Sequence, residues 1–146
     1  MAGWKQIFVA SDHAGFELKK SLITSRKDLP WRDLGPGDAT SVDYPDYADL
    51  VANALKESPD DIGVLICGSG QGMAIRANRY PFVRAALCVT PDMAELARSH
   101  NDANVLALGG RQISIPMALK ILDKFLDAPF EGGRHERRVT KLSKNC

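Results

Sequence analysis

Short apolar runs of strand length alternate along this chain with longer segments in which apolar residues recur every three or four positions. Five runs read as strands, at residues 7–10, 31–34, 62–67, 83–89 and 105–108. Strands that alternate with amphipathic helical segments are typical of a parallel sheet flanked by helices. The pattern therefore predicts a doubly wound α/β fold.

The helical segments are recognised by their apolar stripes. In the first, Leu18 and Leu22 lie one turn apart, and Lys19 and Lys20 are expected to face water. The stripe of the second helix, which begins near Pro45, consists of Ala48, Val51, Ala52 and Leu55. Both segments are amphipathic, so each is expected to pack one face on the sheet.

Three further helices are expected in the second half of the chain. One passes through residues 74–77, and another begins at Pro91, which suits a first turn that needs no N–H donor, and ends near His100. The clearest stripe consists of Met117, Ala118, Ile121, Leu122, Phe125 and Leu126. Residues 131–146 follow as a basic tail. Because no repeat, low-complexity segment or linker interrupts the pattern, residues 1–146 are expected to form a single domain.

Composition narrows the class of protein. With 146 residues, 45% of them hydrophobic and 25% charged, the chain fits one ordinary globular domain. A formal net charge of +1 gives no reason to expect a nucleic-acid or polybasic membrane surface. No apolar stretch approaches the ~20 residues that span a bilayer, and the N-terminus leads into a strand, so we expect a cytoplasmic protein. Three cysteines without paired spacing argue against a disulfide framework and a zinc site.

The strand at residues 62–67 ends in a thiol that is followed by a glycine-rich loop. Cys67 precedes Gly68, Gly70 and Gly72. In open α/β sheets ligands bind beyond the carboxyl ends of the strands, and glycines let backbone N–H groups approach a negatively charged oxygen. The spacing matches neither a dinucleotide-binding nor a P-loop signature. The loop is therefore better suited to a small oxyanion than to a pyrophosphate.

Cys67 also has a structural interpretation, because cysteine is among the most buried residue types. The glycine loop favours a functional thiol, since packing alone does not require a flexible, donor-rich loop at that position. Cys88 has no comparable neighbours and is expected in the core, whereas Cys146 is expected in the solvated tail.

Two polar clusters fall at the ends of predicted elements, at residues 11–15 and 99–104. The histidines of the chain all lie at such ends: His13, His100 and His135. Taken singly, each histidine is explained as a helix cap or a partner of the helix dipole, and Asp12 as an N-cap. Taken together they indicate a function, because ending a helix does not require Asn101, Asp102 and Asn104 as well.

Six motifs together carry a resemblance to a known family. They lie at residues 11–15, 43–45, 67–72 with 77–78, 99–104, 109–111 and 131–135. In this order, and over nearly the whole chain, they resemble the ribose-5-phosphate isomerase B family. The resemblance implies a Rossmann-like three-layer α/β/α sandwich with a five-stranded parallel sheet. It also implies a homodimer or dimer of dimers with interface sites, and interconversion of ribose 5-phosphate and ribulose 5-phosphate without a metal or cofactor. Because the family includes galactose-6-phosphate isomerase subunits, a six-carbon sugar phosphate stays an alternative substrate.

The same resemblance implies catalytic roles. Cys67 is the expected base that removes the proton from C2, and His100 is expected to open the sugar ring, since thiol and imidazole both exchange protons near neutral pH. Ser69 is expected to help move protons between the sugar oxygens, and Asp12 joins the catalytic set. Some family members place a glutamate base just after the glycine loop, but Met73 stands there and cannot accept a proton.

Substrate binding is implied for His13, Tyr44, Gly68, Gly70, Gly72, Asn101, Arg111, Arg134 and Arg138. Within this set, three arginines and His13 match the phosphate site of the family, and Arg137 is interpreted as a solvated neighbour of Arg138. Arg134 and Arg138 follow a Gly-Gly hinge beyond the last core helix, a poor place from which to reach the chain's own Cys67. We therefore expect each site to take residues from two subunits.

Two other classes of protein stay open at this point. A thiol hydrolase would use Cys67 as nucleophile and His100 as base. A non-catalytic phosphosugar-binding module would keep the arginines and tolerate loss of Cys67. A metal enzyme built on Asp12, His13 and His100 is the weakest alternative, because no tight ligand spacing supports it.

Overall fold

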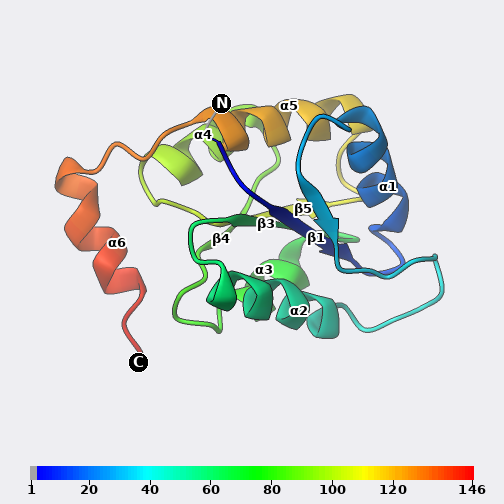
Figure 1. The fold of residues 1–146 in the computed structure, drawn as a ribbon, viewed down its shortest axis with the longest axis horizontal. Coiled ribbons are helices and arrows are strands. Elements are labelled where there is room, and N and C mark those ends of the chain that lie inside the picture. The colour runs from blue at the N-terminus through cyan, green and yellow to red at the C-terminus, as the bar shows by residue number, and fades with distance from the viewer. Residues whose placement is uncertain (1–2) are drawn as a thin grey trace.

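A computed structural model describes residues 3–146 and contains a five-stranded sheet between two layers of helices (Figure 1). The strands are β1 (Ile7–Ser11), β2 (Trp31–Asp33), β3 (Ile62–Cys67), β4 (Ala85–Leu87) and β5 (Val105–Gly109). They pair in parallel in the order β2-β1-β3-β5-β4, so the winding direction reverses between β1 and β3. The prediction of a parallel, doubly wound α/β sheet is confirmed.

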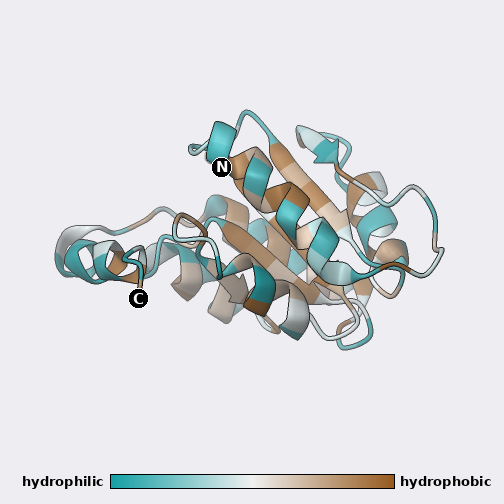
Figure 2. Cartoon of the chain, turned by 90° about the horizontal axis from the view of Figure 1, so that it is seen from below, coloured by the Kyte–Doolittle hydropathy of each residue, from teal (hydrophilic) through white to brown (hydrophobic). Residues whose placement is uncertain are grey.

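Helices cover both faces of the sheet. One layer consists of α1 (Phe16–Ser25), α4 (Pro91–Ser99) and α5 (Ile115–Asp127), and the other of α2 (Tyr44–Glu57) and α3 (Gln71–Ala77) (Figure 1). Successive side chains of a strand point to opposite faces. Ile7 and Val9 accordingly join the core under the first layer, whereas Phe8 and Ala10 join the core under the second. Figure 2 shows the hydrophobic strands between helices that also carry hydrophilic residues.

The edge strand β4 is shorter than the predicted strand at residues 83–89. Before it, the Arg84 N–H donates to Oδ1 of Asn104 at 2.7 Å, and the Asn104 amide donates to the carbonyl of Phe82 at 2.9 Å. After it, Thr90 is already the N-cap of α4. A side-chain bond from Asn104 therefore marks the start of β4 and the cap of α4 follows its end, neither of which apolar character alone reveals.

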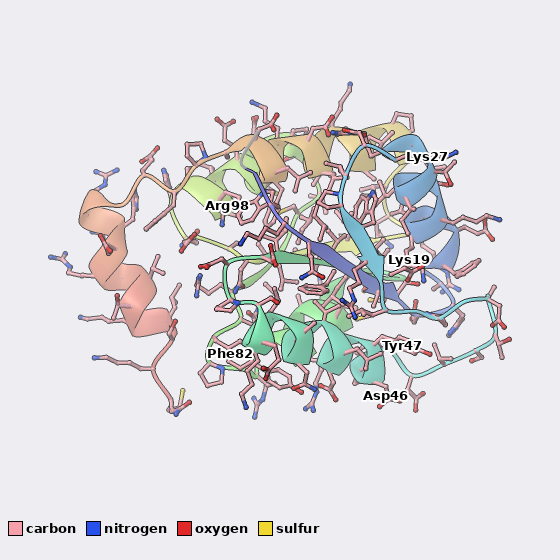
Figure 3. The ribbon with its side chains drawn as sticks, in the orientation of Figure 1. Lys19, Lys27, Asp46, Tyr47, Phe82 and Arg98 are labelled. Carbon is pink, nitrogen blue, oxygen red and sulfur yellow. The ribbon has the colours of Figure 1, made fainter. Side chains whose placement is uncertain are left out.

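Lys19 contradicts the prediction that it faces water. Its side chain is 1% exposed, and Nζ donates to Oδ1 of Asp33 at 2.9 Å and to the carbonyl of Pro36 at 2.6 Å. The ammonium also lies 5.3 Å from the centre of the Phe16 ring. Figure 3 shows Lys19 between α1 and the loop that follows β2. Burial is tolerated because the charge is paired and hydrogen-bonded, whereas Lys20 is exposed as predicted.

The end of the chain is helical where a basic tail is predicted. A 3-10 turn (Gly133–His135) leads into α6 (Glu136–Leu142), which has no buried residue and stands apart from the two layers (Figure 1). Leu142 on this helix is 58% exposed. Across residues 3–146, every helix is too short or too polar to cross a membrane.

Candidate active site

A depression of about 450 Å³ opens at the carboxyl edge of the sheet. It is lined by Asp12, Tyr44, Cys67, Gly68, Ser69, Gly72, Arg111 and Gln112. These residues come from the loops after β1, β3 and β5 and from the start of α2. The structure therefore brings together a large part of the predicted site, and it adds Gln112, which directly follows a predicted residue.

Cys67 ends β3 and is only 5% exposed, yet its sulfur belongs to the wall of the depression. The Gly70 N–H donates to Sγ at 3.2 Å, so a backbone donor of the glycine loop faces the sulfur. The packing interpretation of this cysteine is confirmed by its burial, and its functional role stays a prediction that its place in the wall of the depression supports. Cys88 is buried and Cys146 is exposed, as predicted.

The loop after Cys67 requires glycine for a steric reason. Gly70 has a φ of +78°, and a Cβ there would lie 2.5 Å from Leu87 Cδ1 and 2.9 Å from the carbonyl carbon of Leu108. Only glycine adopts this backbone without strain and fits that space. The resulting turn aims the Gly70 N–H at the sulfur and begins α3 at the next residue. Ser69 is exposed on this turn, and its hydroxyl accepts from the Gln71 N–H at 3.3 Å.

Arg111 lies over the glycine loop. The Gly110 N–H donates to the carbonyl of Cys67 at 2.8 Å, and the Arg111 N–H donates to the carbonyl of Gly68 at 3.0 Å. A Cβ on Gly68 would lie 3.5 Å from the Arg111 guanidinium. The exposed guanidinium therefore supplies positive charge directly beside the backbone groups that follow the thiol.

Tyr44 closes another side of the depression. Its ring packs against Gly72, where a Cβ would lie 2.4 Å from Tyr44 Cε1. Helices α2 and α3 are tied together because the Arg76 guanidinium bonds Oδ1 of Asp49 at 2.7 Å and lowers the pKa of that carboxyl group below its ordinary value. The Tyr80 hydroxyl donates to the same oxygen at 2.7 Å. This link fixes α3, and with it the glycine loop, against α2.

Asp12 and His13 follow β1 at the same edge. Oδ1 of Asp12 accepts from the Gly15 N–H at 3.0 Å, so this buried carboxylate closes the turn into α1 and also borders the depression. The Val42 N–H donates to Nδ1 of His13 at 3.3 Å. Because a backbone N–H only donates, Nδ1 is the acceptor nitrogen, and a neutral His13 carries its proton on Nε2.

His100 lies at the opposite edge of the sheet from Cys67. It caps the end of α4 and precedes β5, whereas Cys67 pairs with Gly109 at the far end of that strand. The ladder from Val105 to Gly109 spans about 13 Å at a rise of about 3.3 Å per residue. Asn101 lines a different cavity, of about 390 Å³, beside β4. Neither residue therefore meets the thiol of its own chain.

The C-terminal segment joins this second edge. The His135 ring stacks on His100 with centroids 4.3 Å apart and planes 13° apart. Glu131 Oε2 lies 3.4 Å from His135 Nε2 and 3.9 Å from His100 Nε2, and the Glu131 N–H donates to the carbonyl of Ser99 at 3.0 Å. The predicted site set omits Glu131 and His135. Glu131 and His135 lie four positions apart with two glycines between them, and this spacing is the feature of the sequence that could have pointed to them.

Arg134 and Arg138 are exposed on the same C-terminal segment. They therefore belong with His100 at the amino edge of the sheet, away from Arg111 and the depression. The predicted phosphate site is split between the two edges within one chain.

Two polar residues of the motif at residues 99–104 have structural roles instead. Asp102 has a φ of 47°, and its carboxylate bonds Arg98 at 3.1 Å and Arg84 at 3.3 Å. Asn104 holds the chain before β4, as described above. The expectation that ending a helix does not need these residues is wrong for Asp102, which holds the turn after α4, whereas Asn104 holds the start of β4.

A parallel α/β sheet whose carboxyl edge carries a thiol, a glycine loop and a guanidinium defines a Rossmann-like domain with a candidate site suited to a small anionic molecule. The model of the Ribose/Galactose Isomerase family matches residues 7–142, and the chain belongs to this family. The resemblance inferred from six motifs is thereby confirmed.

Individual relatives agree over nearly the whole length. Ribose-5-phosphate isomerase B of Escherichia coli is 40% identical over 95% of this chain and 95% of its own length. The crystal structure of a ribose 5-phosphate isomerase from Thermotoga maritima has a TM-score of 0.92 and 51% identity, and the match covers 94% of this chain and 97% of that one. Ribose-5-phosphate isomerase B from Mycoplasma genitalium, solved with bound ribulose-5-phosphate, has a TM-score of 0.88 and 47% identity over 94% and 93% of the two chains.

Proposed function

We propose that this chain is an aldose–ketose isomerase that interconverts ribose 5-phosphate and ribulose 5-phosphate. The observation that carries the proposal is the contact of the Gly70 N–H with Cys67 Sγ at 3.2 Å, in a depression that Arg111 also lines. A base for a carbon-bound proton thus lies beside donors for a developing oxyanion. The names of the family members above, and the ribulose-5-phosphate in one of them, support a five-carbon substrate over a six-carbon one.

The reaction follows from the properties of these groups. His100 opens the furanose by exchanging protons with the ring oxygen and the C1 hydroxyl. The Cys67 thiolate then removes the C2 proton and returns it to C1, while Ser69 helps move a proton between the oxygens on C1 and C2. Negative charge on the enediolate oxygens is met by N–H groups of the glycine loop, a preorganised form of stabilisation. Asp12, Tyr44 and Asn101 complete the proposed contacts with the sugar.

The two edges of the sheet complete one site when two copies pair. His100, Arg134 and Arg138 are too far from Cys67 of their own chain, so we assign them to the site of a partner. In a twofold pair, the amino edge of one copy faces the carboxyl edge of the other, which produces two equal sites. The elements beside edge strand β4 carry exposed apolar side chains suited to such an interface: Ile75, Val89, Met93, Leu96 and Leu142.

The activity is tested with purified protein in EDTA, supplied with ribose 5-phosphate, allose 6-phosphate and galactose 6-phosphate in parallel. Turnover of ribose 5-phosphate should exceed that of the other two. Cys67→Ala should lower kcat by about 10²–10⁴-fold, because a positioned general base supplies that much, while substrate binding measured by calorimetry persists. Cys146→Ser is the matched control, since that thiol is exposed and does not line the depression. Near-normal turnover in Cys67→Ala contradicts the proposal, and a covalent acyl adduct on Cys67 without isomerisation indicates a thiol hydrolase.

The role of His100 is tested by comparing the two directions of the isomerisation. His100→Asn should impair turnover of cyclic ribose 5-phosphate more than that of ribulose 5-phosphate, which cannot form a furanose and arrives open. Equal losses in both directions would show that His100 is not specific to ring opening.

The shared site is tested by mixing inactive variants. Cys67→Ala and Arg138→Ala proteins are dissociated, mixed and reassembled. If each site takes Cys67 from one copy and Arg138 from the other, every mixed dimer holds one intact site, and about a quarter of wild-type activity returns on random pairing. No recovery despite mass-spectrometric proof of mixed dimers would assign a complete site to each chain.

A further inference from the structure

Three metal-ligating side chains converge at the amino edge of the sheet, outside the depression that holds Cys67. They are His100 at the end of α4, and Glu131 and His135 in the segment before α6. One ligand atom from each lies within 4.8 Å of the others. We propose that these residues bind a divalent transition-metal ion of the zinc type, and that the bound ion inhibits the isomerase reversibly.

The spacing of the ligand atoms fits an ion of that size. Zinc binds imidazole nitrogen and carboxylate oxygen at about 2.0–2.2 Å in a tetrahedral arrangement, which separates two ligand atoms by about 3.3–3.6 Å. His135 Nε2 and Glu131 Oε2 are already 3.4 Å apart. His100 Nε2 is 3.9 Å from the same oxygen, and the ligand atoms of all three residues lie within 4.8 Å of one another, so His100 must move closer to complete the site.

One ring must turn for the ion to bind. An imidazole binds a metal along the nitrogen lone pair, in the plane of the ring, and two stacked rings only 13° from parallel cannot both point at one ion. The His135 side chain is 9% exposed, whereas that of His100 is 37% exposed in the single chain and borders the proposed shared site, so His100 is the less confined of the two. We therefore expect His135 and Glu131 to form the fixed part of the site and His100 to close it.

Backbone contacts bring Glu131 and His135 close to His100. The Glu131 N–H donates to the carbonyl of Ser99, the residue before His100, which ties the segment to the end of α4. Gly132 and Gly133 have φ values of +65° and +56°, and this turn brings His135 back over His100. Two imidazoles and one carboxylate select zinc, cobalt, nickel or copper ions over magnesium or calcium, which prefer sets of oxygen ligands.

The inhibitory part of the proposal rests on the proposed function. A metal ion on Nε2 of His100 occupies the lone pair that would accept a proton during ring opening, so ring opening stops until the ion leaves. The binding part stands on the three side chains alone. It is measured without reference to activity.

Zinc chloride is added to EDTA-treated, dialysed protein, and binding is followed by calorimetry and equilibrium dialysis. We expect one ion per chain, with affinity at least tenfold lower in Glu131→Gln and His135→Gln. Glu136→Gln, an exposed glutamate five residues further on, is the matched control and should bind as the wild type does. Cobalt chloride added to the wild-type protein should give the visible absorption of a tetrahedral site with nitrogen and oxygen ligands, which keeps the test open if His135→Gln does not fold.

Activity is measured in the same samples. Zinc should inhibit the turnover of ribose 5-phosphate, and EDTA should restore it; Glu131→Gln should need at least tenfold more zinc for the same inhibition. Binding that is unchanged in both site variants, or lost in Cys67→Ala, would overturn the site. Binding as expected without inhibition would overturn the inhibitory role. A protein that isomerises no sugar phosphate even in EDTA contradicts the proposed function but leaves the binding result intact.

Discussion

Replacing Lys19 by Met tests whether the buried ammonium stabilises the fold. Met keeps most of the length and volume of the side chain but removes two hydrogen bonds, to Asp33 at 2.9 Å and to the Pro36 carbonyl at 2.6 Å. Hydrogen bonds to a charged group contribute about 1.5–3 kcal/mol each, offset by the cost of burying the ammonium. Asp33 is 42% exposed and regains water when its partner is lost. We expect a net loss of about 1–3 kcal/mol in the free energy of unfolding.

The loss is measured by urea and thermal unfolding followed by circular dichroism. For a chain of this length, 1 kcal/mol corresponds to about 2–4 °C in Tm, so Lys19→Met should melt roughly 2–12 °C below the wild type. Lys20→Met is the matched control, because Lys20 is exposed on the same helix, and its effect should stay within about 0.5 kcal/mol. Equal stability of the two variants would refute the reasoning, since the buried contacts would then provide no net stabilisation.

The same variant should also affect substrate binding. Pro36 belongs to the loop at residues 34–43, and the Val42 N–H in that loop donates to Nδ1 of His13. Loosening the loop should raise KM for ribose 5-phosphate more than it lowers kcat, because His13 is expected to hold the phosphate in ground state and transition state alike. A fall in kcat with unchanged KM would mean that Lys19 does not act through His13.

Two further predictions concern other positions. Gly70→Ala should lower Tm and reduce kcat at least about tenfold, since a Cβ at a φ of +78° would lie 2.9 Å from the Leu108 carbonyl carbon. Gly37→Ala is the control, because a Cβ there meets nothing within 4 Å, and it should change neither Tm nor kcat appreciably. Burial raises the pKa of the Cys88 thiol to about 11, so the folded state keeps a proton that the unfolded state loses from about pH 9. The free energy of unfolding should therefore fall by about 1.4 kcal/mol per pH unit between pH 9 and 11, and urea titrations of Cys88→Ala should lack this component.

The central part of the sheet was predictable because its strands are short and wholly apolar. Every residue of β3 is buried, and a thiol followed by alternating glycines stands out at its end. Edge strand β4 was less predictable, since its residues are only partly buried and its start depends on a side chain of Asn104 about 20 positions away. Local apolar character locates a strand, but hydrogen bonds from distant residues set where it ends.

Lys19 shows what periodicity cannot reveal. Two of its partners are Asp33, 14 residues away, and the carbonyl of Pro36, 17 residues away. A lysine has an apolar stem and a charged end, so the same position in a helix suits water or a paired interior equally well. Only the packing of α1 beside β2 decides between the two.

The division of the candidate site between the carboxyl and amino ends of the strands could be predicted in part from the order of elements in the sequence. In a parallel sheet, a residue that ends a strand, such as Cys67, and a residue that precedes one, such as His100, lie at opposite edges. The proximity of Glu131 to His100 and His135 could not be predicted from the sequence, because it depends on the direction in which the turn at Gly132 folds. Glycine indicates that a turn is possible there, and tertiary contact decides where it leads.

Helix α6 supplies an independent argument for a partner. It has seven residues and none of them is buried, and its apolar residue Leu142 is 58% exposed. A helix this short is marginal in water, because the cost of nucleation is not recovered over two turns. Most helical stability in proteins comes from packing an apolar face, and within its own chain α6 buries no residue. We therefore propose that the surface that stabilises α6 belongs to a second copy of the chain, which the proposed shared site also requires for Arg134 and Arg138.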